Sequence, residues 1–201
     1  NDRPEEFANT GLINIEKNID KFMVAAQVLN KPVGVVYESK YHLMVVDICI
    51  GKNGYYTYER IIPKIQGIAV AVLAEWSGRF FLLKQYRHAL RDWQYAIPRG
   101  FAKDGLSGKD NAVKNVIEKT GCTVSNITYL GTTVADSGLS GTKVAVYHAK
   151  CSEPDFKYGT GNAAQLVSVK PEELKKMIHD GKVTDGFTMT ALMMYLAKKT
   201  N

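Results

Sequence analysis

Three polar residues at helical spacing have the chemistry to hold a cation. Asn111, Asn115 and Glu118 lie at positions i, i+4 and i+7 of the segment 110–120, so in a helix they share one face. Mg²⁺ prefers oxygen ligands, and its protein sites usually include one or two carboxylates. Glu118 is the only carboxylate of the three, and the positive charge of Lys119 follows it directly. The segment therefore predicts a surface with weak affinity for divalent cations.

These residues belong to a longer segment, RGFAKDGLSGKDNAVKNVIEKTGC, which spans residues 99–122. The segment resembles a degenerate Nudix box, whose pattern is Gx5Ex7REUxEExGU, where U is a bulky aliphatic residue. The two glycines, the internal aliphatic residue and one of the paired glutamates match, and a cysteine takes the final aliphatic position. The matching residues are Gly100, Val116, Glu118 and Gly121, with Cys122 at the end; Leu106, Lys114, Asn115 and Lys119 replace expected residues.

The flanking segments resemble the ADP-ribose pyrophosphatase branch of the Nudix superfamily. Upstream, FFLLKQYRHALRDWQYAIPRGF is similar to a hydrophobic strand followed by Gln-Tyr-Arg and Trp-x-x-Glu-x-Pro-Ala-Gly. Ala96 stands in place of the glutamate, and Arg99 in place of a small residue. Downstream, ADSGLSGTKVAVYHAK and HDGKVTDGFTMTALMMYLAKK are similar to a loop with its strand and to the last helix of the branch. The resemblance extends from about residue 33 to residue 199.

The resemblance implies that hydrolysis is lost or weak. Working members hold Mg²⁺ or Mn²⁺ on the box carboxylates against a diphosphate, and the metal helps to generate the attacking hydroxide. Glu118 is the one box carboxylate retained here as a candidate catalytic or metal-binding residue. Mg²⁺ or Mn²⁺ is therefore expected as a cofactor only if unusual ligands complete a metal site. The loop 157–165, which matches the position of a further catalytic glutamate, contains no acid.

The resemblance also implies a set of ligand-binding residues. Arg60 and Arg87 match positions where the branch places arginines that contact the substrate, and a guanidinium suits bidentate contact with phosphate. Arg99 and Gly100 border the same expected cleft, and Lys119 is available to a ligand phosphate. For each arginine, an ordinary salt bridge at the end of a strand is the alternative interpretation.

Glu118 also has an interpretation without a ligand. Lys114 and Glu118 lie at i and i+4, a spacing that favours a surface salt bridge. On the other side of the same helix, four apolar residues are expected to face the sheet: Ala112, Val113, Val116 and Ile117.

The hydrophobic pattern predicts an α+β protein with the Nudix fold, an α/β/α sandwich with a mixed sheet. Apolar residues at helical spacing over 11–29 predict a helical N-terminal extension, residues 1–31. The Nudix-like domain follows at 32–201 and begins with a β-rich segment, 32–62, expected to contribute to a homodimer, since members of the branch are commonly dimeric. Helices after Pro171 and Thr188 end the chain.

Composition sets limits on the partners and the location. The net charge of +6 and the pI near 9.1 permit an anionic partner, but the positive charge is spread along the chain. The three cysteines and four histidines show no spacing typical of a zinc site. No signal peptide and no apolar run of about 18 residues is recognisable, so we expect no membrane partner and a cytoplasmic location.

Three functions are compatible with these observations. The first is binding of a nucleoside-diphosphate-linked metabolite, such as ADP-ribose, by a sensor or scaffold that hydrolyses it weakly or not at all. The second is a working Mg²⁺-dependent pyrophosphohydrolase with unusual ligands drawn from Glu118, Asp104, Asp110 and Asp136. The third is RNA binding by a degenerate Nudix protein, which the absence of a basic stripe makes less favourable.

Overall fold

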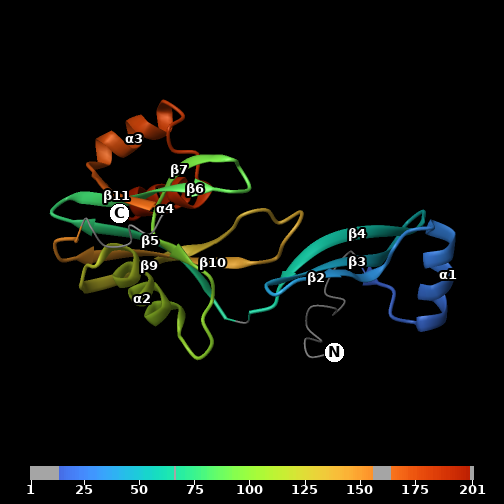
Figure 1. The fold of residues 1–201 in the computed structure, drawn as a ribbon. Coiled ribbons are helices and arrows are strands. Elements are labelled where there is room, and N and C mark those ends of the chain that lie inside the picture. The colour runs from blue at the N-terminus through green and yellow to red at the C-terminus, as the bar shows by residue number, and fades with distance from the viewer. Residues whose placement is uncertain (1–13, 66, 156–163, 200–201) are drawn as a thin grey trace. The chain divides into compact units, whose positions relative to one another are not determined.

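The chain forms two compact units. The computed structural model describes residues 14–65, 67–155 and 164–199. The first unit comprises residues 1–64 with 136–141, and the second comprises 65–135 with 142–201; Figure 1 labels most of their elements. The predicted helical extension, 1–31, lies within the first unit, and its separation from residues 32–201 stays a prediction.

The first unit contains an antiparallel sheet, which confirms the β-rich segment predicted there. Strand β3 pairs with each of the other three strands. A two-residue turn joins β3 to β4, closed by Gly51 and Gly54. Gly54 has φ +115, a conformation that favours glycine. The strands are β1 (Asn14–Ile15), β2 (Gly34–Glu38), β3 (His42–Gly51) and β4 (Gly54–Pro63).

Helix α1 (Ile19–Leu29) is shorter than predicted. The side chain of Asn18 accepts a hydrogen bond from the backbone N–H of Lys21 at 3.1 Å, so Asn18 caps the helix and fixes its start. The predicted helical start at residue 11 is wrong for the described residues, because Asn14 and Ile15 pair with β3. The helix ends at Asn30, which has φ 48, a left-handed conformation that asparagine tolerates.

The second unit is built on a mixed sheet of seven strands in which β10 runs parallel to β5. The central path of the sheet is β11-β6-β5-β10-β9, and β7 and β8 pair with β6 and β5. Strand β5 is apolar except for Glu75 and is buried on both faces, as expected for a central strand of this composition. The strands are β5 (Ala69–Trp76), β6 (Arg79–Arg87), β7 (Asp92–Ala96), β8 (Arg99–Gly100), β9 (Val124–Val134), β10 (Lys143–Cys151) and β11 (Ala164–Val169).

Helices cover both faces of this sheet. Alternate residues of β5 belong to two different apolar clusters, as expected when successive side chains point to opposite faces. One cluster includes α3 (Pro171–His179) and α4 (Gly186–Lys199), and the other includes α2 (Gly108–Thr120). Figure 1 shows α2 on one side and α3 and α4 on the other, so the second unit is the predicted α/β/α sandwich. No helix within the described ranges is both long and apolar enough to span a membrane.

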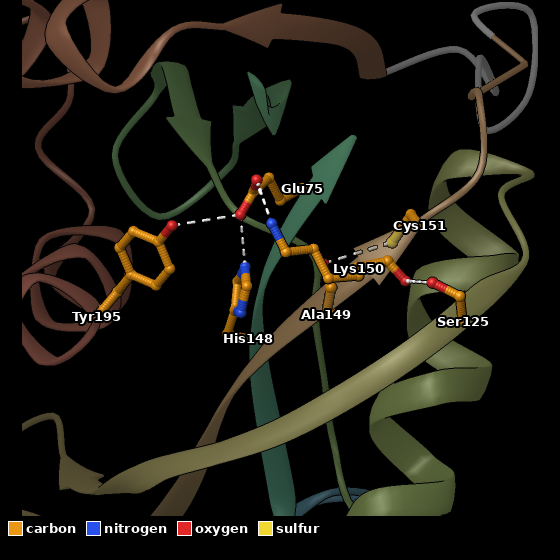
Figure 2. Close-up of polar contacts among 7 residues, drawn as sticks. All are labelled: Glu75, Ser125, His148, Ala149, Lys150, Cys151 and Tyr195. Carbon is orange, nitrogen blue, oxygen red and sulfur yellow. Dashed lines mark hydrogen bonds and ion pairs between the residues drawn. The ribbon is translucent and has the colours of Figure 1, made fainter. Parts of the chain in front are cut away.

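A buried polar cluster attaches α4 to the sheet (Figure 2). The carboxylate of Glu75 on β5 lies 2.8 Å from Nε2 of His148 and accepts a hydrogen bond from the hydroxyl of Tyr195 at 3.3 Å. Lys150 also donates to this carboxylate. Glu75 is only 6% exposed, so the three partners from β10 and α4 supply the contacts that water would otherwise make.

Candidate functional site

A pocket of about 420 Å³ opens within the second unit. It is formed by the end of the β6–β7 hairpin, strand β8, the end of β9 and the beginning of α4. Its walls combine apolar side chains with a few polar groups, the usual composition of a small-molecule site. The lining residues are Arg87, Ala89, Leu90, Gln94, Arg99, Thr133, Val134, Ala135, Asp185, Gly186, Phe187 and Thr190.

The structure brings two of the predicted arginines together in this pocket. Nη1 of Arg99 lies 3.3 Å from Oδ1 of Asp185, and the guanidinium lies 5.1 Å from the ring centroid of Phe187. Nε of Arg87 is buried and has no hydrogen-bond partner within the described part of the chain. Burial and the charge of Arg99 lower the pKa of Arg87, against the opposing effect of Asp185. Two guanidinium groups thus share one carboxylate, and the pocket retains a net positive charge that suits an anion.

Asp185 positions both the pocket and the helix that borders it. Its Oδ2 accepts hydrogen bonds from the backbone N–H of Thr188 at 3.0 Å and from the Thr188 hydroxyl at 2.7 Å. The carboxylate therefore caps α4 while its other oxygen faces Arg99. Sequence reasoning did not identify Asp185 as a site residue, although the pattern Asp-x-x-Thr before an apolar helix is a capping signal.

The inward face of α2 differs from the prediction. Asn111 and Asn115, expected to point away from the sheet, are 1% and 2% exposed, whereas Ile117, expected to face it, is 41% exposed. Nδ2 of Asn111 donates to the carbonyls of Ile68 and Phe101 at 3.1 and 3.0 Å. These backbone acceptors satisfy the Nδ2 atom of the buried amide, whereas its Oδ1 atom has no hydrogen-bond partner within the described residues. Val113 is only half-buried. The predicted positions of Val113 and Ile117 against the sheet are therefore wrong.

Gly100 allows this close packing. A Cβ atom at residue 100 would lie 2.0 Å from Nδ2 of Asn115, which no side chain could accommodate without displacing the amide. The structure thus gives Gly100 a packing role. Its predicted contact with a ligand stays a prediction.

Glu118 does not pair with Lys114 as predicted. Nζ of Lys103 lies 2.9 and 2.8 Å from the two carboxylate oxygens of Glu118. The hydrogen bond from Lys103 is the main reason why the pKa of Glu118 is lowered, with a smaller opposing effect of burial and further lowering by the charges of Lys103, Lys114 and Lys119. Lys119 itself is half-buried. The surroundings of Glu118 are therefore cationic.

The donor set around Glu118 does not fit a divalent cation. No cluster of three His, Cys, Asp or Glu side chains within residues 14–65, 67–155 and 164–199 has the arrangement to hold a metal ion. Asp110, named above as a possible ligand, accepts a hydrogen bond from the Ser107 hydroxyl at 2.6 Å. Asp136 belongs to the first unit. The loop 157–165, which matches the position of a further catalytic glutamate but contains no acid, lies largely outside the described residues.

Arg60 lies in the first unit rather than in the pocket. Its Nε is 2.6 Å from Oδ2 of Asp47, which is 6% exposed. This contact between β3 and β4 is a salt bridge, as in the alternative interpretation for the predicted arginines, but both residues lie within their strands and not at a strand end. A ligand contact for Arg60 stays a prediction.

Comparison with known proteins establishes the fold. No family model matches the sequence, and no curated protein matches it either. Among solved structures, the chain is similar to one described as an ADP compounds hydrolase, with a TM-score of 0.72 and 17% sequence identity. The match covers 83% of this chain and 90% of that chain. Together with the mixed sheet between its helices, this likeness confirms the predicted Nudix fold, and at such low identity it concerns the fold alone.

Proposed function

We propose that this protein binds a nucleoside-diphosphate-linked metabolite, such as ADP-ribose, and hydrolyses it weakly or not at all. The observation that carries the proposal is the pair of guanidinium groups, Arg87 and Arg99, in one pocket with a single carboxylate, Asp185. A diphosphate supplies the negative charge that this pocket lacks. The ADP compounds hydrolase of the same fold supports a ligand that contains ADP.

The limited hydrolysis follows from the donor set. A working site of this kind needs carboxylates to hold Mg²⁺ against the phosphates. Glu118 is bonded through both oxygens to Lys103, and the neighbouring acid Asp110 is bonded to Ser107. Metal-dependent turnover would need ligands that these residues do not supply, so the sensor or scaffold role is favoured over the hydrolase.

Calorimetry with ADP-ribose in excess EDTA tests the binding. The wild-type protein should bind, and Arg87→Met should weaken binding about tenfold or more, because each charged hydrogen bond contributes about 1.5–3 kcal/mol. Lys109→Met, which removes an exposed positive charge from α2, should leave the affinity unchanged. Absence of ADP-ribose binding, combined with a salt-dependent shift of short RNA, would instead favour the nucleic-acid hypothesis.

Release of phosphate from ADP-ribose, measured after coupling to a phosphatase in the presence of Mg²⁺, tests the loss of hydrolysis. The expected result is no turnover above background. Turnover that Glu118→Gln abolishes would contradict it and would restore the hydrolase hypothesis.

A homodimer is part of the proposal. Large apolar side chains on α1 and β2 are more than half exposed, and exposed apolar surface of this kind marks association sites. Light scattering on a sizing column should give twice the mass of the chain, and Val24→Lys with Val28→Lys should give the monomer mass. The exposed side chains are Ile19, Met23, Val24, Val28, Val35 and Tyr37.

A cytoplasmic location remains a prediction.

A further inference from the structure

Lys103 contacts Glu118 as a bound cation would. Its ammonium lies within 2.9 Å of both carboxylate oxygens. Lys103 is the first residue of a turn between β8 and α2, in which the backbone N–H of Leu106 donates to the Lys103 carbonyl at 3.2 Å and Gly105 has φ +74. The turn fixes the backbone of Lys103 opposite a residue on the last turns of α2. This placement depends on the fold and not on local spacing along the helix.

The amide side chains that could have joined Glu118 as metal ligands are buried in the packing of α2, and the Oδ1 atom of each has no hydrogen-bond partner within the described residues. Asn111 donates to two backbone carbonyls, and Asn115 packs against Gly100. Both are almost fully buried, whereas the side chain of Glu118 is 44% exposed. A divalent cation at Glu118 would therefore find a carboxylate already paired with an ammonium, and no group of three or more His, Cys, Asp or Glu side chains within the described residues is placed to hold it.

We propose that the Lys103 ammonium takes the place of a divalent cation at Glu118, and that this surface binds a diphosphate group without metal. We call the surface formed by Lys103, Lys114, Glu118 and Lys119 the Lys103 surface. The proposal rests on the proposed function for the class of ligand. It adds a second set of cationic side chains for the phosphates, besides Arg87 and Arg99 in the pocket, and the independence of binding from Mg²⁺.

The chemistry of an ammonium group supports this assignment. Lysine has three N–H donors, and two of them are used by the two oxygens of Glu118. The third donor is available to a phosphate oxygen, because the Lys103 side chain is 34% exposed. The ammonium can thus bridge a carboxylate and a phosphate, as a metal ion does. Lys114 and Lys119 both act electrostatically on Glu118, so three positive charges surround one negative charge and the Lys103 surface attracts anions.

Calorimetry with pyrophosphate in excess EDTA tests the inference directly. The wild-type protein should bind, and Lys103→Met should weaken binding about tenfold, the loss expected for one charged hydrogen bond. Lys103→Arg keeps a cation with several donors and should retain the affinity within about threefold. Lys109→Met removes the same charge from an exposed position on the same helix and should have no effect. Thermal melts of the variants should match that of the wild type.

Other outcomes would overturn the inference. The inference is wrong if pyrophosphate does not bind, or if its binding requires Mg²⁺. It is also wrong if Lys103→Met binds pyrophosphate as tightly as the wild type does, and weaker binding by Arg87→Met would then place the anion in the pocket. Saturable binding of Mn²⁺ to the wild-type protein, measured as loss of the electron paramagnetic resonance signal of free Mn²⁺, would overturn it as well. Failure of ADP-ribose to bind while pyrophosphate binding depends on Lys103 would count against the proposed nucleoside ligand and in favour of the Lys103 surface.

Discussion

Replacement of the buried carboxylate of Glu75 by an amide tests the cluster that attaches α4 to the sheet. Glu75→Gln keeps the shape of the side chain but removes its charge and one acceptor. His148 and Lys150 then lose their ionic partner, and the new amide N–H₂ is placed against donors. A buried donor or acceptor left without a partner costs more than the mean value of a hydrogen bond.

The magnitude follows from the exposure of each partner. The His148 side chain is 12% exposed, so its bond to Glu75 contributes about 1.5–3 kcal/mol, the range for charged hydrogen bonds. The Lys150 side chain is 52% exposed, so solvent replaces most of its interaction and its share is about 1 kcal/mol or less. The Tyr195 bond is long, at 3.3 Å. We therefore expect Glu75→Gln to lower the free energy of unfolding by about 2–4 kcal/mol at pH 7.

The dependence of stability on pH provides a second readout. Burial raises the pKa of Glu75, but hydrogen bonds and charges from Lys150 and His148 outweigh it, so the pKa is lowered from its ordinary value of 4.5. Burial, together with the charges of Lys150 and Lys199, lowers the pKa of His148 below 6.5 against the opposing effect of Glu75. Each group therefore binds protons more readily in the unfolded chain, and the folded state loses stability as pH falls. The contribution of His148 to the free energy of unfolding is lost as the pH falls below about 6.5, and that of Glu75 as the pH falls below about 4.5.

Urea unfolding of the wild type and Glu75→Gln at several pH values between 7.5 and 4 measures both effects. Glu153→Gln is the matched control, because Glu153 is exposed and lies outside the helices and strands. The control should unfold at the same urea concentration as the wild type. A loss of less than about 0.5 kcal/mol for Glu75→Gln, or a wild-type stability that stays constant from pH 7 to 4, would refute the reasoning.

Two further predictions, one about a substitution and one about a chemical modification, follow from the packing of the second unit. Gly100→Ala should lower the melting temperature, because its Cβ would lie 2.0 Å from Nδ2 of Asn115, and adding Asn115→Ala should recover part of the loss; equal melting temperatures for the wild type and Gly100→Ala would contradict the close contact. Burial raises the pKa of the Cys151 thiol to about 12, so only about one thiol in ten thousand is ionised at pH 8. Mass spectrometry should show Cys151 alkylated by iodoacetamide slowly in the native protein and completely in urea, and rapid native alkylation would refute this.

The sequence predicts the sheet and its helices well because local patterns determine them. The apolar run at 69–76 becomes the doubly buried strand β5, and Ser77 and Gly78 turn the chain into β6, with φ values of 50 and 74. These positive values suit the two-residue turns that join antiparallel strands. Such features depend on neighbouring residues alone, so they can be identified without the structure.

The site is harder to predict because it depends on contacts between distant segments. Helical spacing correctly places Ala112 and Val116 against the sheet. It does not decide whether the side with Asn111 and Asn115 or the side with Val113 and Ile117 is buried beside them. Carbonyls at residues 68 and 101 decide this choice by accepting from Asn111. In the same way, Lys103 rather than Lys114 bonds to Glu118 because of a turn outside the helix, and Asp185 reaches Arg99 from a segment far along the chain.

The route of the chain limits how the protein can be divided for study. It crosses from one unit to the other three times, after residues 64, 135 and 141. Segment 136–141 bonds to β4, since the N–H of Ile61 donates to the Leu139 carbonyl at 2.8 Å and the Tyr58 hydroxyl donates to the Gly138 carbonyl at 2.7 Å. A shortened protein that begins at residue 65 would retain this segment without the strand that satisfies it. Independent folding of the second unit therefore calls for replacing 136–141 with a short glycine-containing hairpin loop between β9 and β10.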